Sequence, residues 1–472
     1  MVIRFGPPLL AAALLTFAAA CGDDNAAENG AGTNGTGTNG SSTNGSTNGG
    51  GTADAGVTPD SGSGNGSVDA GAPAADAGPA DSGSEPPCES NADCSGDTPF
   101  CDLEAAVCAP PPRGGLIGWG DGSTASVTIE SIYRAPQTEA AQTTDLTFNP
   151  EGNNEIWLSH RMEPNDLPCN QADRRGCFAL QGSTTTIFDA GTPDQTEQWI
   201  MDFNAWHFMR RPPAIAWGEN GFFATCGYAR TGNFLDDQAD FIGPSLWTSD
   251  PEIYRNWEVN NTPPGWNGTH MDMLHASPWC LGIAHEMGNA YWVANGQIGS
   301  LDRYDFKADH GPGQADHSDG EVQRYAIGTL LREPFVPGHL EYHDGVVYAA
   351  DPGNGRVIGF DPAGAEQVGG IRPQYEPLAF DATYSGGTLT ELVPPGGRIT
   401  TPSGLAIHDD VLYVGDNATG DIHAFELDGT WLRSLDTGLP EGHLAGIEVS
   451  PDGVMYFVDM LGSEVSRILP NP

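Results

Sequence analysis

Residues 401–429 read TPSGLAIHDDVLYVGDNATGDIHAFELDG and contain three short apolar runs, LAI, VLYVG and IHAF. Segments rich in Gly, Asn and Asp separate the runs. β-Branched and aromatic residues favour strands, while Gly, Asn and Asp favour the turns between strands. The stretch therefore predicts a small antiparallel sheet.

The same pattern recurs and divides the chain into six units. In the clearest unit, Gly404 begins the innermost strand and Asp416 ends the second strand. The matching pairs in four other units are Ala214 and Cys226, Gly282 and Asn295, His339 and Asp351, and Gly446 and Asp459. The first unit, DLTFNPEGNNEIWLSHR, matches least well, and we expect its second strand to end at His160. Such repetition indicates sheets that bury their faces against one another.

The units resemble NHL-type blades, in which Pro-x-Gly-Ile-Ala-Val is followed by Gly-x-Val-Tyr-Val-Ala-Asp. The resemblance implies an all-β, six-bladed β-propeller over residues 113–472, because an open array would expose unpaired strand edges. The last unit runs out of chain after EVSRIL, three strands in. We expect the alternating segment ASVTIESIYRA, from Ala125 to Ala135, to supply its missing outer strand.

The N-terminus indicates export. Residues 1–21 contain the apolar run LLAAALLTFAAA and end at Cys21, which is typical of a secretory signal peptide. Ala18-Ala19-Ala20-Cys21 resembles a bacterial lipobox, in which the cysteine is acylated and becomes the mature N-terminus. The resemblance implies a lipoprotein that Cys21 anchors to a membrane of the bacterial cell envelope. Secretion without a lipid anchor is the alternative.

Two small segments follow the signal. Residues 22–86 consist almost wholly of Gly, Asn, Thr, Ser, Ala, Asp and Pro, and such a segment cannot bury enough apolar surface to fold, so we expect a disordered linker. Residues 87–112 form a Cys-rich module. It has too few apolar residues for a hydrophobic core, so cross-links must stabilise it. Its cysteines are Cys88, Cys94, Cys101 and Cys108. Two disulfides of open connectivity are expected, because an exported chain favours oxidation and a zinc site usually has closer Cys pairs.

The other four cysteines fall within the repeats. In the propeller alignment, Cys226 ends the second strand of blade two and Cys280 lies just before blade three, so these two positions share one face of neighbouring blades. We expect a disulfide between them. Cys169 and Cys177 lie in one loop of blade one, and we expect them to close that loop.

The charge of the chain excludes one class of partner. With 19 Lys and Arg against 63 Asp and Glu, the net charge is −44. Nothing would neutralise the phosphates of a nucleic acid, so nucleic acid is not expected as a partner. The expected partners are the membrane, through the lipid anchor, and an unidentified protein or small-molecule ligand.

Several polar residues are expected on the face of the propeller around its central channel. They are His160, Arg161, His207, Arg210, Asp351, Asp416 and Asp459. Imidazoles, cations and carboxylates on one face would suit metal binding or acid–base chemistry. In NHL-type blades, however, the aspartates accept hydrogen bonds from turn amides, and a histidine in a loop is commonly a surface residue. A propeller that binds a ligand or protein partner through this face is therefore the first functional hypothesis.

The alternative hypothesis is a metal-dependent lyase or hydrolase. Its candidate ligands are His275, His339 and His443. Gly338-His339 and Gly442-His443 resemble the Pro-His pairs at the blade entries of peptidyl-hydroxyglycine amidating lyases, and the resemblance implies a channel zinc. The histidines differ in their offsets from the strand starts, which argues against a symmetric site. The acidic residues of 309–321 offer either a calcium site or a solvated loop.

Overall fold

The structure is a computed structural model. It describes residues 87–88, 93–94, 100–102, 106–119, 121–136, 141–152, 154–162 and, apart from 234, 236, 259 and 315, residues 181–471. The expected signal peptide with Cys21, the linker 22–86, and Cys169 with Cys177 lie outside the described residues. Among the described residues, none of the helices has the length and hydropathy of a membrane-spanning helix.

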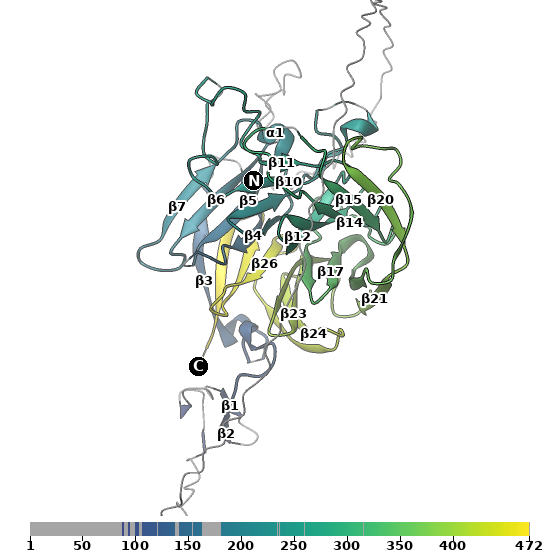
Figure 1. The fold of residues 1–472 in the computed structure, drawn as a ribbon. Coiled ribbons are helices and arrows are strands. Elements are labelled where there is room, and N and C mark those ends of the chain that lie inside the picture. Colours follow the sequence, from purple (N-terminus) through teal and green to yellow (C-terminus); the bar gives the residue numbers. More distant parts are fainter. Residues whose placement is uncertain are drawn as a thin grey trace, which may run out of the picture. The chain divides into compact units, whose positions relative to one another are not determined.

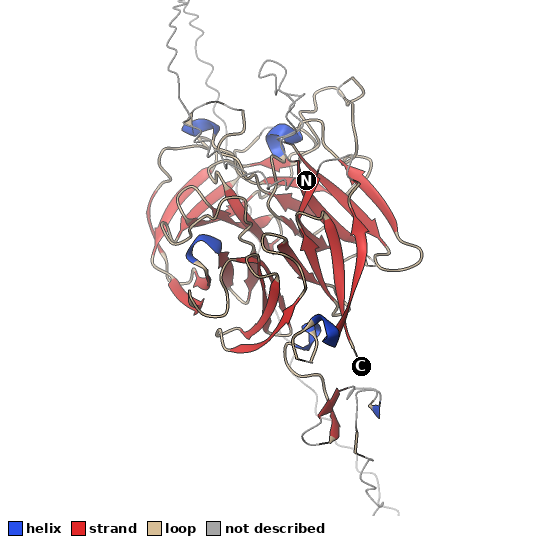
Figure 2. Ribbon diagram, turned by 180° about the vertical axis from the view of Figure 1, so that it is seen from behind, coloured by secondary structure: helices blue, strands red, loops and turns tan. Residues whose placement is uncertain are grey.

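The described part is almost entirely β, and six sheets, antiparallel except for one parallel pair, surround a common axis (Figures 1 and 2). The expected six-bladed β-propeller is therefore confirmed. Blade one consists of β4 (Ala141–Phe148), β5 (Ile156–Met162), β6 (Gly182–Phe188) and β7 (Thr196–Ile200), and blade two of β8 (Ile215–Trp217), β9 (Phe222–Thr225), β10 (Ser245–Thr248) and β11 (Asp272–Met273). Blade three begins with β12 (Cys280–Met287), β13 (Ala290–Asn295), β14 (Ser300–Asp305) and β15 (Glu321–Tyr325).

The remaining blades follow the same order from the axis outward. Blade four consists of β16 (Leu340–His343), β17 (Val346–Asp351), β18 (Arg356–Asp361) and β21 (Thr388–Val393), and blade five of β22 (Pro402–His408), β23 (Val411–Asp416), β24 (Asp421–Glu426) and β25 (Trp431–Asp436). Blade six consists of β26 (Leu444–Val449), β27 (Met455–Asp459), β28 (Glu464–Pro470) and β3 (Val127–Arg134). The inner strands β4, β8, β12, β16, β22 and β26 contact one another in this order, and β26 contacts β4. The ring is thus closed.

Strand β3 completes the last blade, as the sequence predicts. It pairs antiparallel with β28, so Tyr133 lies opposite Val465 and Val127 lies opposite Pro470. The side chain of Tyr133 is buried, and its hydroxyl lies 3.3 Å from Thr185 Oγ1 of blade one. One strand from before the first blade therefore joins the two ends of the ring.

Blade three differs from the other blades because an insertion from blade four extends its sheet. After β18, the chain forms β19 (Glu366–Gly369) and β20 (Phe380–Ser385) before it returns to blade four as β21. Strand β20 pairs in parallel with β15, so Glu321 lies opposite Phe380. Blade three has six strands as a result, and the loop between β19 and β20 lies beside it.

The repeat predicts four of the six second-strand ends to the residue, and in blade two β9 ends at Thr225, one residue before the expected Cys226. The second strands of blades three to six end at the expected residues, which are Asn295, Asp351, Asp416 and Asp459. The expectation for His160 is wrong, because β5 continues to Met162 and places His160 inside the strand. The described helices are short: α1 (Ala205–Phe208) and the 3₁₀ turns η2 (Gly115–Ile117), η3 (Thr124–Ser126), η7 (Gln238–Asp240) and η8 (Pro352–Asn354).

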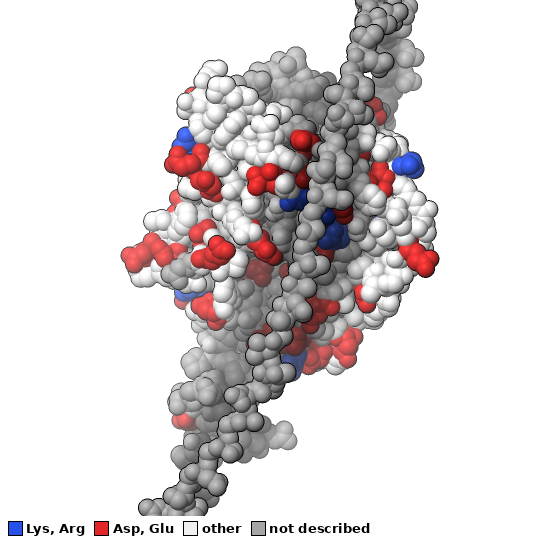
Figure 3. Space-filling view, viewed as in Figure 1, with Lys and Arg blue, Asp and Glu red and all other residues white. Residues whose placement is uncertain are grey.

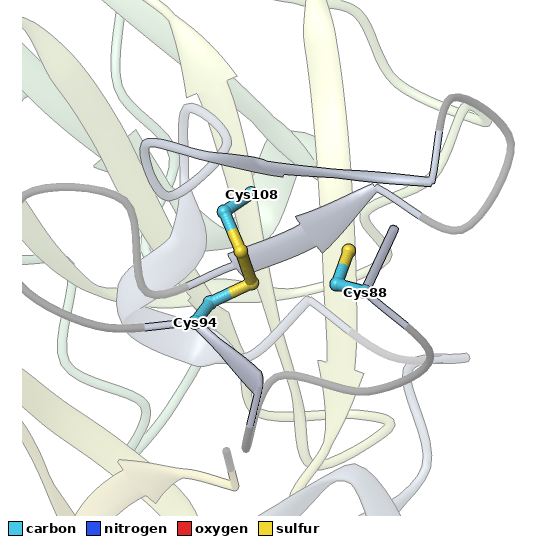
Figure 4. A group of neighbouring side chains, drawn as sticks. All are labelled: Cys88, Cys94 and Cys108. Carbon is cyan, nitrogen blue, oxygen red and sulfur yellow. A yellow bond between two sulfur atoms is a disulfide. The ribbon is translucent and has the colours of Figure 1, made fainter. Parts of the chain in front are cut away.

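Disulfides cross-link both the Cys-rich module and the propeller. The module contains β1 (Phe100–Asp102) and β2 (Val107–Ala109), and its bonds are Cys88–Cys101 and Cys94–Cys108, the latter visible in Figure 4. These sulfurs are therefore not zinc ligands. The expected bond between Cys226 and Cys280 is present, with a Cα–Cα distance of 5.9 Å, and joins blade two to the start of blade three.

Replacing Tyr133 by alanine tests the closing role of β3. The change removes a buried ring between the first and last blades, so we expect the free energy of unfolding to fall by about 3–5 kcal/mol. Denaturant unfolding of Tyr133→Ala measures this loss. Ser131→Ala in the same strand is the control, because Ser131 is exposed, and it should change the free energy little. Equal stability of the two variants would show that β3 does not hold the ring closed.

A second prediction concerns the disulfide between blades two and three. Its cysteines are 54 residues apart, and the chain-entropy model gives a loss of about 4 kcal/mol when a bond that closes such a loop is removed. We expect the double variant Cys226→Ser/Cys280→Ser to unfold at correspondingly lower denaturant concentration. Unfolding of the unchanged chain after reduction should give a similar or larger loss, and no loss in the double variant would contradict the prediction.

Candidate metal centre

The aspartates at the ends of the second strands have structural roles. Asp351 and Asp416 are fully buried, Asp459 is half-buried, and all three accept hydrogen bonds from backbone amides of nearby loops. The donors are the amides of Leu331, Thr400, Thr401 and Gly462. These carboxylates therefore fix the loops of blades four to six.

His160 and Arg161 of β5 are also engaged in internal contacts. The His160 ring is fully buried, and its nitrogens lie 3.0 Å from Thr143 Oγ1 and 2.8 Å from Thr185 Oγ1. Burial lowers the pKa of His160 to about 3, so the ring is neutral at physiological pH. Arg161 donates through Nε to Gln142 Oε1 at 2.7 Å.

His207 and Arg210 lie on or just after α1 and are covered by the blade-two loops. Burial lowers the pKa of His207 to about 4 and that of Arg210 to about 10. Arg210 Nη1 donates to the carbonyl of Thr231 at 2.5 Å. Both side chains contribute to the packing of this region.

The structure does not bring His275, His339 and His443 together. His339 Nδ1 lies 3.3 Å from Asp145 Oδ1, and His443 Nδ1 lies 2.8 Å from Asp459 Oδ1. Within the described residues, the groups whose ligand atoms lie within 4.8 Å of one another include His275 but neither of the other two. The unequal offsets of these histidines from their strand starts explain the separation.

His275 instead joins His317 and Glu376 in a compact group, which we call the His–His–Glu site. The two Nδ1 atoms contact one carboxylate, His275 at Oε1 and His317 at Oε2, the latter at 3.0 Å. The side chains of His275 and His317 are 17% and 18% exposed, and that of Glu376 is 5% exposed. The carboxylate is thus buried, and the two imidazoles keep a small exposed fraction.

None of the three residues lies on an inner strand of the ring. His275 follows β11, the outer strand of blade two, whereas His317 lies in the loop between β14 and β15. Glu376 lies between β19 and β20, in the insertion from blade four. The site is therefore a junction of blades two and three, and it does not lie among the residues that line the central channel.

The backbone after His275 is held by a polar network inside blade three. Tyr304 Oη donates to the carbonyl of His275 at 2.9 Å, and Arg324 Nη2 donates to that of Ala276 at 2.6 Å. Arg324 in turn pairs with Asp302, a carboxylate that is fully buried. Ala276 has a φ of 100°, which is unusual for a residue with a side chain. The network holds this turn in place and so fixes the direction of His275.

Backbone hydrogen bonds bring the histidine loop of blade three against blade two. The amide of His310 donates to the carbonyl of Met271 at 3.3 Å, and the amide of Gly313 donates to that of His270 at 2.8 Å. His270 Nε2 also lies 3.1 Å from the carbonyl of Gln314. The loop between β14 and β15 therefore runs beside the segment that leads to His275.

Glu376 is the member of the His–His–Glu site that the repeat pattern misses. It lies in an insertion that belongs to no repeat unit. The backbone amide of His275 donates a hydrogen bond to Glu376 Oε1 at 2.6 Å. Tyr375, the residue directly before Glu376, stacks on Phe241 with ring centroids 5.3 Å apart. This contact helps to hold Glu376 in place. The sequence indicates this insertion only by its length. About 40 residues separate the strand RVIGFD from the fifth unit, although the blade needs only one more strand there.

The two histidines keep the Glu376 carboxyl group ionised. Burial raises the pKa of Glu376, but the hydrogen bonds from His275 and His317 outweigh burial and lower the pKa to about 2. For His317, burial lowers the pKa, and the opposing effect of Glu376 and Asp272 leaves it raised. Histidine and glutamate are both common zinc ligands, so this group of three residues is a candidate metal site.

The central channel contains a separate polar cavity of about 150 Å³. Three carboxyl groups line it, those of Asp145, Glu341 and Glu448, together with His339. Burial raises the pKa of Asp145, of Glu341 and of Glu448, and lowers the pKa of His339 to about 4. The cavity is a candidate pocket for a small polar ligand.

Comparison with known proteins gives fold similarity alone. No family model matches the chain, and no curated protein matches it. Solved structures that resemble it include an auxiliary nutrient binding protein from Bacteroides thetaiotaomicron, with 11% identity, a TM-score of 0.43, and 69% of this chain and 68% of that chain covered. A streptogramin B lyase has 11% identity and a TM-score of 0.41, with 73% and 98% covered. Similarity of this size carries no argument about function.

The buried neutral state of His160 gives a prediction about pH. Between a folded pKa of about 3 and an unfolded pKa of about 6.5, only the unfolded chain binds the proton, so stability falls as the pH drops below 6.5. The contribution of one histidine is up to about 1.4 kcal/mol per pH unit.

The variant His160→Gln removes the imidazole that binds this proton in the unfolded chain. We expect its free energy of unfolding to fall less steeply between pH 6.5 and 4 than that of the unchanged protein, whereas the two curves should run parallel above pH 7. Equal slopes below pH 6.5 would show that His160 is protonated in the folded state.

Proposed function

We propose that this protein is a metal-dependent hydrolase or lyase whose divalent metal, zinc, is held by His275, His317 and Glu376. The observation that supports this function most is that two imidazole nitrogens and one buried carboxylate come together from three separate loops. Two histidines and a glutamate are a ligand set of catalytic zinc sites, and the same set also suits iron.

The distances show how far the site must adjust for such a role. Zinc binds histidine nitrogen at about 2.0–2.1 Å and carboxylate oxygen at about 2.0–2.2 Å, so two ligand atoms of a tetrahedral ion lie about 3.3–3.5 Å apart. The 3.0 Å between His317 Nδ1 and Glu376 Oε2 is a hydrogen-bond distance. Both imidazole rings would therefore move away from the carboxylate to admit the ion.

Three protein ligands leave a coordination position for water or substrate. The bound metal would lower the pKa of that water to near 7 and polarise a carbonyl oxygen of the substrate. Tyr304 and Arg324 fix the turn after His275, so this ligand would be held in a constant direction toward the metal. Asp and Glu spread over the visible face of the propeller, with few Lys and Arg among them (Figure 3), and this charge disfavours polyanionic substrates.

Ligand binding through the channel is the second candidate function. The cavity lined by Asp145, His339, Glu341 and Glu448 supports it, because carboxyl groups enclosed in one pocket can donate and accept hydrogen bonds with a small polar molecule. This function requires neither the metal nor the His–His–Glu site.

We infer that the propeller works outside the cytoplasm. Three disulfides support this location, since such bonds persist in oxidising compartments. Residues 1–21 would direct export, Cys21 would carry the lipid anchor, and 22–86 would link it to the Cys-rich module 87–112 and the propeller 113–472. Labelling with a radioactive fatty acid such as palmitate tests the anchor, and a Cys21→Ser chain should not be labelled.

Metal binding and open coordination can both be tested with cobalt. We expect the metal-free protein to bind one tightly held Co²⁺ with visible absorption bands, and these bands should shift when acetohydroxamate is added as a fourth ligand. Glu376→Gln and His317→Ala should each weaken binding about 100-fold or more, because even changes in residues behind a metal ligand cost 10–100-fold.

His408→Ala is the matched control, since His408 is a partly exposed histidine beside Asp409 and away from the site. It should bind cobalt as the unchanged protein does. If acetohydroxamate does not shift the bands, the metal has no open coordination position and the site is structural. If the protein does not bind cobalt, the proposed metal-dependent function is wrong.

A further inference from the structure

A second group of potential ligands adjoins the His–His–Glu site. Its members are Asp272, His310 and Asp319, whose ligand atoms lie within 4.8 Å of one another. His310 Nδ1 is 3.6 Å from Asp272 Oδ2, and His310 Nε2 is 3.2 Å from Asp319 Oδ1. The two groups interact electrostatically, because the Asp272 carboxylate acts on His317 and Glu376 acts on Asp272.

Within the described residues, this group contains buried polar atoms that no hydrogen bond satisfies. The Asp272 side chain is 1% exposed, and its Oδ2 makes no hydrogen bond. His310 Nδ1, which faces it, is also buried without a hydrogen bond. The 3.6 Å between the two atoms is too long for a hydrogen bond. The two atoms are close enough for an ion pair but make no hydrogen bond, and a cation between them would satisfy both buried groups.

The two atoms are held in place by backbone structure. Asp272 lies on β11, where its other oxygen, Oδ1, accepts the amide of Met273 at 2.7 Å. The amide of His310 donates to the carbonyl of Met271, the residue directly before β11. The backbone hydrogen bonds at these two residues therefore hold Asp272 and His310 beside each other.

We propose that Asp272, His310 and Asp319 bind a second divalent cation beside the metal of the His–His–Glu site, so that the protein has a two-metal centre. This inference rests on the proposed function for its catalytic meaning, but the cation site itself does not require it. Two carboxylates and one imidazole form a harder ligand set than two imidazoles and one carboxylate, so the second site prefers a cation of the manganese or calcium kind.

A second cation changes the chemistry that the junction can perform. Two neighbouring metals can hold the attacking water and the departing oxygen of a substrate at the same time. The exposed side of Asp319, at 38%, leaves this edge open to solvent and therefore to a substrate. The substrate class that fits best is a small neutral or cationic molecule with a hydrolysable carbonyl group.

Manganese titration of the full-length protein tests the second site. The protein is first loaded with one equivalent of Zn²⁺, and Mn²⁺ is then added while the free-ion electron paramagnetic resonance signal is recorded. We expect one equivalent of Mn²⁺ to disappear from the free signal. If the Mn²⁺ signal stays entirely that of the free ion, the proposal of a second site is wrong. This result would not contradict the His–His–Glu site.

Variants then separate the two sites. Asp319→Asn should weaken manganese binding about 10-fold or more and keep cobalt and zinc binding unchanged, since Asp319 is exposed and its replacement should not unfold the chain. Glu376→Gln should lose tight zinc and retain manganese binding. If Asp319→Asn binds manganese as tightly as the unchanged protein, the assignment is wrong.

Asp309→Asn is the matched control for charge. Asp309 is exposed, directly precedes His310, and belongs to neither ligand group. It removes the same charge from the same loop, so it should leave manganese affinity unchanged if the site is specific. An equal loss in Asp309→Asn and Asp319→Asn would show that manganese only collects on an acidic surface, and would overturn the proposal.

Discussion

The pairing of β3 with β28 is the interaction on which the rest of the structure depends. Each blade can bury its two faces only against its neighbours, so the first and last blades stay half-exposed unless the ring is closed. Strand β3 closes it by placing Tyr133 between blades six and one. Once the ring is closed, the position of every blade is fixed by its two neighbours, and loops can change without loss of the fold.

Such a scaffold explains how an insertion can build a site. Strand β20 pairs with β15, so the chain of blade four crosses to blade three and places Glu376 against His275. The buried pair Arg324–Asp302 fixes the turn that follows His275. The disulfide Cys226–Cys280 joins blades two and three near the same turn. Side chains from three blades therefore meet at one point because the backbone beneath them is rigid.

The fold can be predicted from the sequence because strand and turn preferences recur at a fixed spacing, which predicts the blade number, the closing strand and the bond Cys226–Cys280. The site follows no such spacing. The sequence indicates His275 as a candidate ligand, but His317 and His310 lie in an acidic loop and Glu376 lies in an insertion outside the repeat. Pairing of β20 with β15 is a long-range contact that no local pattern encodes.

Nitrogen ligands are what distinguish this junction from the rest of an acidic surface. A chain with a net charge of −44 attracts cations everywhere, but solvated carboxylates hold them weakly and without preference. Imidazole adds affinity for transition metals, and burial of Glu376 and Asp272 prevents water from competing for the carboxylates. Two of the described ligand groups contain histidine, and both lie where blade two meets blade three. Selective metal binding is therefore expected at this junction and not across the surface as a whole.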